Sequence, residues 1–268
     1  MQLAAINIYP IKSCAGISLA SSRVMCTGLE WDRHWMLVRD DGRFVTQREL
    51  PMLATIVPRI VPPSLVLSAP GEQPLSIPLS AAGGARSVTV WRDRVGGIDC
   101  GDAVAAWLSA VTRESLRLVA FDPALPRASN PVFTGAVTAF TEFSDGYAIL
   151  LLSETSLEDL NGRLPGQPLE MAQFRPNLVL SDASAYAEDK FSELRIGAVT
   201  LRVVKPCTRC KITTIDQRSG IQHGDEPLRT LRGYRYDRQL NGVTFGQNAI
   251  VLNGVGQELK VGMAVHTC

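Results

Sequence analysis

The chain has 268 residues, of which 46% are hydrophobic and 20% are charged, and its formal net charge is +1. This near-neutral balance lacks the excess of basic groups that holds a phosphate backbone, so it argues against nucleic acid as a partner. The chain does not start like a signal peptide, and its apolar runs are too short to cross a bilayer. We therefore expect a soluble, cytoplasmic protein without a membrane span, whose six cysteines are reduced thiols.

The first half of the sequence predicts many short strands. Runs of alternating or β-branched apolar residues indicate strands over residues 2–9, 17–26, 36–39, 43–47, 54–61, 64–68, 75–77, 87–91 and 116–120. An Asp-Asp-Gly turn occupies residues 40–42, and Asp102 is placed to cap a helix over residues 103–112. Short strands at such close spacing are typical of a barrel or a sandwich.

The second half follows a proline-containing segment at residues 121–130, which is the best candidate for a domain boundary. Strands are predicted over residues 148–152, 178–180, 194–196, 199–204, 249–252 and 259–266. Ser153 is placed to cap a short helix that ends near Leu160, and residues 228–233 predict a helical turn. The expected fold class is therefore mainly β with short helices (α+β).

A Cys-x-x-Cys pair, Cys207 and Cys210, ends one of these β-like runs, with Arg209 between the two thiols. A thioredoxin-like pair would begin a helix inside a βαβ unit, but residues 211–215 are β-branched and more strand-like than helical. A structural zinc site needs four ligands, and no second closely spaced Cys or His pair accompanies the first. Both interpretations therefore have little support.

The plainest alternative is that both cysteines are buried structural thiols, as free cysteines often are. Two features argue against it. Thr208 and Arg209 are polar and fit poorly in a dry core, and a neighbouring guanidinium favours the thiolate form that binds metals. A soft thiolate beside cationic and amide groups suits a soft metal carried by an anionic cofactor. The residues alone predict a thiolate ligand site for an unidentified metal.

Four segments together carry a family resemblance: residues 8–14 (Ile-Tyr-Pro-Ile-Lys-Ser-Cys), 174–177 (Phe-Arg-Pro-Asn), 207–216 and 245–247 (Phe-Gly-Gln). In this order they resemble the MOSC superfamily, named after the C-terminal domain of molybdenum cofactor sulfurase. The branch they resemble has an N-terminal β-barrel domain and includes the mitochondrial amidoxime-reducing component and bacterial YcbX-type proteins. The resemblance implies an N-terminal β-barrel-like domain over residues 1–120 and a MOSC β-barrel domain over residues 121–268.

The resemblance also implies a pterin-based molybdenum cofactor whose metal is bound by the thiolate of Cys210, the catalytic and metal-binding residue; Cys207 has no ligand role by this analogy. The positions that match cofactor contacts of the family are Lys12, Ser13, Arg33, Arg175, Asn177, Thr208, Arg209 and Asn248. Gly146 and Tyr147 replace hydroxyl-bearing residues of the mitochondrial relatives, so only backbone contacts are expected there. Guanidinium and amide groups suit a phosphate and a pterin edge. Taken singly, Lys12 and Arg33 would be interpreted as ordinary surface charges.

The implied activity is that of an oxidoreductase that reduces N-hydroxylated compounds (hydroxylamines, N-hydroxylated bases and amidoximes) to amines, with two electrons and two protons and release of water. The alternative is a carrier that binds molybdenum cofactor or delivers sulfur without turnover. The cysteines outside the pair lack iron–sulfur spacing, so no such cluster is expected in this chain. Electrons would come from a separate protein of the ferredoxin, flavoprotein reductase or cytochrome type. A further expectation is that the superfamily is described as binding pyridoxal phosphate.

Overall fold

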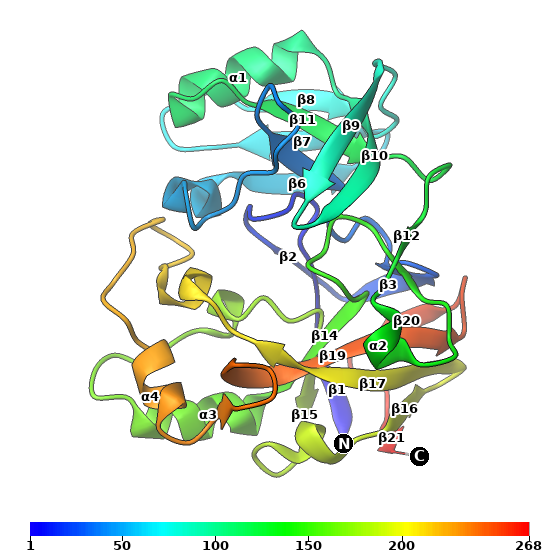
Figure 1. Cartoon of the computed structure of the whole chain (residues 1–268), viewed down its shortest axis with the longest axis vertical. Coiled ribbons are helices and arrows are strands. Elements are labelled where there is room, and N and C mark those ends of the chain that lie inside the picture. Colours follow the sequence, from blue (N-terminus) through cyan, green and yellow to red (C-terminus); the bar gives the residue numbers. More distant parts are fainter. Residues whose placement is uncertain (268) are drawn as a thin grey trace.

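The computed structural model describes residues 1–267, and most of its regular structure is strand. In Figure 1 the N-terminal half, with α1 and β5 to β11, lies above a large sheet built mainly from the C-terminal half. The predicted fold class, mainly β with short helices, is confirmed. Cys268 lies outside the described residues, and the other five cysteines are free thiols.

The large sheet carries the candidate site at one of its edges. Within residues 1–267 its strands, in spatial order, are β2 (Ile17–Leu19), β1 (Gln2–Ile8), β15 (Leu178–Ser181), β14 (Ile149–Ser153), β19 (Gly242–Asn253), β17 (Val199–Thr208), β16 (Glu193–Ile196) and β21 (Val265–Thr267), with β18 (Tyr236–Asp237) paired to β19. β14 runs parallel to β15, and the other neighbours are antiparallel. The first strand of the chain thus belongs to the C-terminal sheet, and the division at residues 120 and 121 stays a prediction.

Four smaller sheets complete the strand structure of the described residues. They are β5 (Trp35–Val38), β11 (Arg117–Phe121), β10 (Asp93–Asp99) and β9 (Ala85–Val90); β6 (Val57–Val61), β7 (Ser64–Ser68) and β8 (Leu75–Pro78); β20 (Glu258–Lys260), β3 (Ser21–Met25) and β4 (Gly28–Leu29); and β12 (Arg127–Ala128) with β13 (Phe140–Thr141). The first two sheets lie in the N-terminal half. Because β3 pairs with β20, an N-terminal strand also joins the C-terminal part of the chain there, on the right of Figure 1.

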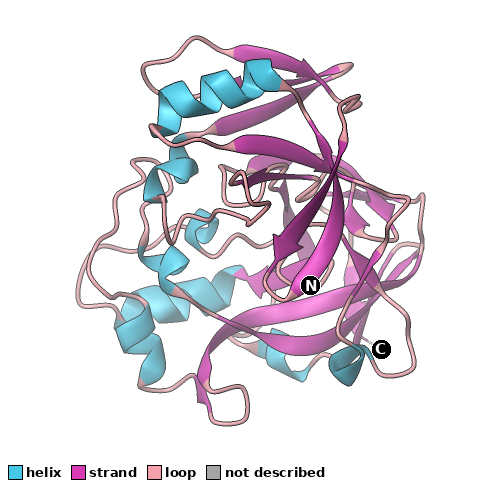
Figure 2. Cartoon of the chain, turned by 45° about the horizontal axis from the view of Figure 1, so that its top comes forward, coloured by secondary structure: helices cyan, strands magenta, loops and turns pink. Residues whose placement is uncertain are grey.

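Most of the helices lie on the left of the view in Figure 2, beside the strands. The helices are α1 (Asp102–Thr112), α2 (Pro131–Thr134), α3 (Glu154–Arg163) and α4 (Leu228–Arg232), and the 3-10 turns are η1 (Pro51–Thr55), η2 (Met171–Gln173), η3 (Ala187–Lys190) and η4 (Lys211–Thr214). Ser153 caps α3 as predicted, because its hydroxyl oxygen accepts from the N–H of Ser156 at 3.2 Å. In the chain up to residue 267, no helix is long and apolar enough to span a membrane.

Several boundaries differ from the sequence prediction. Residues 17–26 form two strands in different sheets rather than one, β2 against β1 and β3 against β20. The expected strand over residues 43–47 is reduced to isolated bridges, and the last expected strand is split into β20 and β21. The helix α1 is capped by Gly101, with φ +98°, and not by Asp102, which is its first residue.

No side-chain hydrogen bond caps α1, and Asp99 instead fixes the chain that leads into the helix. Asp99, at the end of β10, accepts the N–H of Gly101 at 2.7 Å and binds Arg117 through both oxygens, at 2.6 and 2.7 Å. Arg86 adds a third cationic contact at 2.5 Å, and the Asp99 side chain is only 9% exposed. Chiefly the Arg117 hydrogen bonds, opposed by burial, lower the pKa of Asp99 to about 2.

This pKa predicts a stability contribution with a defined pH dependence. A carboxyl whose pKa falls on folding stabilises the protein above its unfolded pKa of about 3.9, and that contribution is lost as the pH falls towards 2. Asp99→Asn is expected to lower the free energy of unfolding by roughly 2 kcal/mol at pH 7, with the deficit shrinking between about pH 4 and pH 2. Urea titrations across this range measure it. Asp102→Asn, which removes the exposed partner of the same arginine, is the control and should cost much less; equal costs would contradict the prediction.

Candidate functional site

All eleven predicted site residues line one cavity of about 860 Å³ that opens to solvent between the large sheet and the N-terminal half. Topology explains this convergence. The antiparallel pairing of β1 with β15 and the parallel pairing of β15 with β14 put the end of β1 and the starts of β15 and β14 at one edge of the sheet. Asn248 of β19 lies opposite Leu150, near the start of β14. Lys12 and Ser13 follow β1, Arg33 precedes β5, Gly146 and Tyr147 precede β14, and Arg175 and Asn177 precede β15.

The cysteine pair lies where β17 ends. The N–H of Arg209 donates to the carbonyl of Val243 at 2.8 Å, which holds the end of β17 against β19. Cys210 then begins η4, and its carbonyl accepts from the N–H and the hydroxyl of Thr213 at 3.1 and 3.0 Å. Residues 211–215, which are more strand-like than helical in composition, therefore begin with a 3-10 turn over Lys211–Thr214. Both thiols line the cavity, with Cys210 exposed and Cys207 half-buried.

The two thiols differ in their contacts. Arg209 donates from Nη1 to the sulfur of Cys207 at 2.9 Å and from Nη2 to the carbonyl of Phe174 at 2.5 Å. Cys210 has no comparable partner within residues 1–267, so its sulfur faces the cavity without a protein donor. Among those residues, no group of three or more His, Cys, Asp or Glu side chains is arranged to hold a metal. A metal here would need ligands from a cofactor in addition to Cys210.

Phe-Gly-Gln places Asn248 beside the thiols. Gly246 has φ +78°, and a Cβ there would lie 2.8 Å from the Leu151 carbonyl oxygen, so only glycine lets β19 approach β14 this closely. Two residues later, Asn248 lies opposite Leu150 of β14 and donates from Nδ2 to the carbonyl of Lys205 at 3.2 Å. Thr208, across from β19, is exposed at the cavity wall.

Two arginines of the cavity lining lie over the ring of one buried tyrosine, Tyr9. The guanidinium carbon of Arg33 is 4.5 Å, and that of Arg175 is 4.2 Å, from the Tyr9 ring centroid. Burial raises the pKa of Tyr9 to about 12, so this phenol is neutral at physiological pH. Burial, with the charge of Arg33 adding to it, lowers the pKa of Arg175 to about 10, so it remains a cation. Arg33 has a carboxylate partner in Asp32 at 2.5 Å, but Arg175 binds only neutral acceptors such as the Cys14 carbonyl, at 2.7 Å.

The side chain of Asn177 is hydrogen-bonded to other groups of the protein. Its side-chain oxygen accepts from Arg33 at 2.9 Å and from the N–H of Leu150 at 3.0 Å, and its NH2 group donates to the Asn7 carbonyl at 3.2 Å. The residue is 1% exposed. It therefore orients Arg33 and ties β1, β14 and β15 together, and these contacts occupy most of its hydrogen-bonding capacity.

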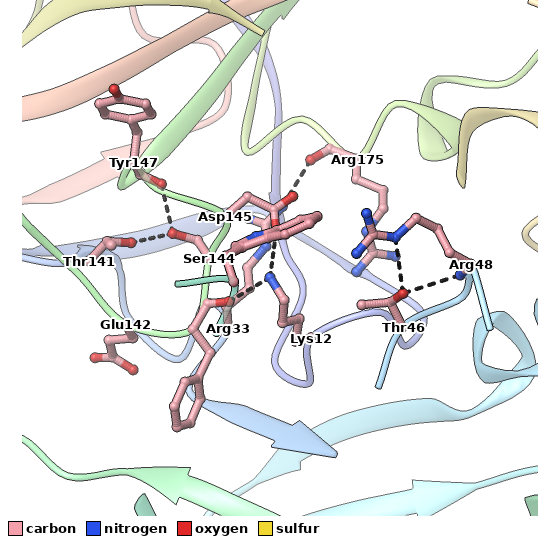
Figure 3. Close-up of polar contacts among 12 residues, drawn as sticks. Lys12, Arg33, Thr46, Arg48, Thr141, Glu142, Ser144, Asp145, Tyr147 and Arg175 are labelled. Carbon is pink, nitrogen blue, oxygen red and sulfur yellow. Dashed lines mark hydrogen bonds and ion pairs between the residues drawn. The ribbon is translucent and has the colours of Figure 1, made fainter. Parts of the chain in front are cut away.

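Figure 3 shows the ammonium group of Lys12 pointing towards Asp145. Its Nζ is 2.5 Å from Asp145 Oδ1 and 2.8 Å from the Phe143 carbonyl oxygen. Surrounding protein atoms disfavour ionisation of Asp145, but Lys12 and the indole N–H of Trp91 outweigh this and hold the pKa of the carboxyl below its usual range. Lys12 and Asp145 thus form an ion pair in the cavity wall.

Gly146 and Tyr147 lie on the segment that follows Asp145. A Cβ on Gly146 would meet no atom within 4 Å, so this backbone faces open space. The Tyr147 carbonyl accepts the Ser144 hydroxyl at 2.8 Å, and Ser144 also contacts the Thr141 hydroxyl (Figure 3). Burial raises the pKa of Tyr147 to about 12. The backbone of this segment is therefore the part presented to the cavity.

Backbone strain is concentrated at the site. Of the nine non-glycine residues with positive φ in residues 1–267, four line the cavity: Ser13, Arg33, Trp91 and Arg175. Such conformations cost free energy and persist where surrounding contacts impose them, as they do at binding sites. The side chains of Arg33 and Arg175 are thereby directed over Tyr9.

The sequence interpretation missed part of the lining. Thr46, Arg48 and Trp91 come from the N-terminal half, Ser144 and Asp145 precede β14, and Leu150, Phe174, Ile212 and Thr213 supply mainly apolar wall. Arg48 and Trp91 carry no local pattern that marks them, because only the packing of the two halves brings them to the cavity. Trp91 is the last residue of the strand predicted over residues 87–91, and Arg48 directly follows the one predicted over residues 43–47.

A buried pair of amides joins the two halves beside the site. The NH2 group of Gln47 donates to Gln217 Oε1 and that of Gln217 to Gln47 Oε1, each at 3.0 Å. Gln47, fully buried, also donates to the Ser13 carbonyl at 2.7 Å. The loop after η4 is therefore fastened to the N-terminal half next to Ser13 and Arg175.

Removing one amide of this pair is expected to destabilise the protein. Gln217→Leu leaves the buried side-chain oxygen of Gln47 without its donor, which costs roughly 1–3 kcal/mol of unfolding free energy. Gln47→Leu should cost a similar amount, and the double variant less than the sum, as urea titration of all four proteins in a double-mutant cycle will show. Gln239→Leu, at an exposed position, is the control. Strictly additive costs would mean that the amides do not interact.

The lining can accommodate an anionic cofactor. Five cationic side chains line the cavity (Lys12, Arg33, Arg48, Arg175 and Arg209) against the single carboxylate of Asp145. Within residues 1–267, Arg209 Nε is also one of the few buried side-chain nitrogens without a hydrogen-bond partner. Unpartnered buried donors are costly and call for a ligand, and guanidinium groups bind phosphate well. The donor set therefore fits a phosphate-bearing group beside a thiolate-bound metal.

Comparison with known proteins agrees with this geometry. The MOSC N-terminal beta barrel domain matches residues 1–115 and the MOSC domain matches residues 140–266. Mitochondrial amidoxime-reducing component 1 of Mus musculus is 38% identical over 242 residues, which cover 87% of this chain and 71% of the relative. The Homo sapiens component 1 is 35% identical, covering 98% and 82%, and the Bos taurus component 2 is 35% identical, covering 85% and 70%. The chain therefore belongs to the MOSC family, in the branch with an N-terminal MOSC β-barrel domain that contains the mitochondrial amidoxime-reducing components.

Proposed function

We propose that this protein is a molybdenum-cofactor-dependent oxidoreductase that reduces N-hydroxylated compounds to amines. For an amidoxime, the products are an amidine and water, and the reaction consumes two electrons and two protons. The observation that carries the proposal is the exposed, unpartnered thiol of Cys210 in a cavity lined by five cations and one carboxylate. The names of the relatives supply the substrate class, since they are amidoxime-reducing components.

Each part of the cavity has a role in this proposal. Cys210 would ligate the metal, and Arg209, Arg175 and Lys12 would hold the anionic part of the cofactor, with Ser13, Arg33, Thr208, Asn248 and the backbone at Gly146 and Tyr147 completing the contacts. When bound, the cofactor would supply the two-electron redox chemistry. Asn177 orients Arg33, and Phe174, Leu150 and Ile212 give an apolar wall that limits access of water.

Pyridoxal phosphate suits the same lining less well. A lysine that is free to react with its aldehyde would be needed, and Lys12 is the one lysine among the described lining residues. Its ammonium is held by Asp145 and by the Phe143 carbonyl. We further propose that electrons come from a separate protein of the ferredoxin, flavoprotein reductase or cytochrome type. Cytoplasmic localisation stays a prediction, as these relatives are mitochondrial by name.

The test begins with protein produced in a host that makes molybdenum cofactor. We expect about one molybdenum and one pterin per chain, and reduction of benzamidoxime to benzamidine when a reduced viologen dye supplies electrons. Protein without molybdenum and pterin would overturn the proposal. Protein that holds both but reduces neither benzamidoxime nor a hydroxylamine would instead be a cofactor or sulfur carrier.

A further inference from the structure

Arg48 differs from the other cations of the cavity in having unused donors. Lys12 and Arg33 form ion pairs with carboxylates, and Arg175 and Arg209 donate to backbone carbonyls. The side chain of Arg48 makes one hydrogen bond, from Nε to the hydroxyl of Thr46 at 3.3 Å (Figure 3). Within residues 1–267 no carboxylate pairs with it. Both terminal nitrogens of its guanidinium are therefore free to bind a ligand in the cavity.

The surroundings of Arg48 hold it in place for such a ligand. Its guanidinium carbon lies 4.2 Å from the centroid of the Trp91 ring system. Trp91 is itself fixed: its indole N–H donates to Asp145 at 3.1 Å, and its ring lies 5.3 Å from that of Phe44. A stacked guanidinium with a preset orientation binds a planar carboxylate through two parallel hydrogen bonds better than a mobile ammonium does.

Trp91 is more exposed than several buried residues of the lining. Lys12, Ser13 and Asn177 are 5%, 6% and 1% exposed, whereas Trp91 is 46% exposed. Arg48 is half-buried, as Arg33, Arg175 and Arg209 are, but it stacks on the exposed Trp91. The Arg48–Trp91 pair therefore lies at the rim of the cavity on the N-terminal wall, next to Asp145, which also binds Lys12. Arg48 and Trp91 line the same cavity as Cys210, so they can contact a substrate that binds there.

We propose that Arg48, supported by Trp91, is a specificity-determining residue that binds a carboxylate or similar anionic group on a planar N-hydroxylated substrate. This inference rests on the proposed function, which it deepens by naming the substrate class: N-hydroxylated compounds that bear a negative charge at the end remote from the N–O bond. A neutral substrate would gain only the stacking surface of Trp91. A cationic substrate would meet like charge at the rim and bind more weakly.

The experiment compares matched substrates that differ in charge: benzamidoxime, 4-carboxybenzamidoxime and 4-(aminomethyl)benzamidoxime. Wild-type molybdenum-loaded protein should favour the carboxylated compound over the cationic one in kcat/KM. In Arg48→Gln, kcat/KM for the carboxylated compound should fall roughly tenfold or more through KM, while that for benzamidoxime changes less than about twofold. Arg48→Lys should retain part of the preference. Arg92→Gln, at the exposed neighbour of Trp91 outside the lining, is the control.

Two further readouts make the outcome unambiguous. Binding of 4-carboxybenzamidoxime to the oxidised, loaded protein without reductant should weaken in Arg48→Gln to the same extent as KM rises, with molybdenum content unchanged. Loss of molybdenum in Arg48→Gln would assign Arg48 to the cofactor and overturn the inference, as would equal effects on neutral and carboxylated substrates or the absence of a charge preference in the wild type. If no substrate is reduced but Arg48 still governs binding of the carboxylated compound, the proposed function fails and the anion site stands.

Discussion

Cys210→Ala is expected to abolish molybdenum binding and to lower reduction of benzamidoxime by more than about 100-fold, because it removes the only protein ligand that we assign to the metal. The backbone of Cys210 is fixed by the two bonds from Thr213 to its carbonyl, and its thiol lines the cavity. Neighbouring loops cannot substitute for it, since the described chain offers no cluster of three further metal-binding side chains here. Molybdenum per chain, measured by mass spectrometry, checks the first effect independently of turnover.

Cys207→Ala is the matched control for this prediction. Its sulfur accepts a hydrogen bond from Arg209 at 2.9 Å, so its loss frees one guanidinium nitrogen without removing a metal ligand. We expect molybdenum to be retained and activity to fall by less than about tenfold. Cys26→Ala, at an exposed thiol outside the cavity lining, should change neither. Loss of molybdenum from Cys207→Ala together with retention in Cys210→Ala would show that the other thiol is the ligand.

The part of the site that could be predicted from sequence is the part carried by short motifs at strand ends. Lys12 follows the end of β1 and Arg175 precedes the start of β15, and the antiparallel pairing of these strands puts both at one edge of the sheet. Arg209, just after β17, lines the same cavity although it is far from both in the chain. No local pattern encodes the opposite wall. Arg48 and Trp91 reach the cavity only because the N-terminal half packs over that edge, and the packing depends on tertiary contacts such as the Gln47–Gln217 pair.

Local errors have equally specific causes. Residues 212–214 have β-branched side chains that favour a strand, but the Thr213 hydroxyl and N–H bind the Cys210 carbonyl and turn the chain into η4. The segment over residues 17–26 alternates like one strand, yet the Ala20 carbonyl accepts from Val261, and the chain changes sheets there. In both cases a hydrogen bond decides the conformation, and the strand propensity of the residues does not take that bond into account.

Arg175→Met is expected to weaken cofactor retention by roughly 100-fold while leaving the cofactor-free protein as stable as the wild type or about 1 kcal/mol more stable. Cofactor retention and the stability of the cofactor-free protein change in opposite directions, because the buried charge of Arg175 is unfavourable until an anion binds to it. Burial and Arg33 lower the pKa of Arg175 to about 10, so the folded protein without ligand stabilises the cation less than water does. This penalty applies throughout the pH range in which the side chain is charged, including pH 7. Methionine fills a similar volume without the charge, at the cost of the bond to the Cys14 carbonyl.

Arg175→Lys separates charge from shape at the same position. An ammonium keeps the positive charge but cannot lie flat over the Tyr9 ring, 4.2 Å from its centroid, and donate in two parallel directions. We expect roughly tenfold weaker retention of the cofactor, between the wild type and Arg175→Met. Dialysis of loaded protein followed by metal analysis measures retention, and urea titration of cofactor-free protein measures stability. Arg59→Met, on the exposed strand β6, should change neither quantity. If Arg175→Met destabilised the cofactor-free protein but retained molybdenum, Arg175 would stabilise the fold and would not bind the cofactor.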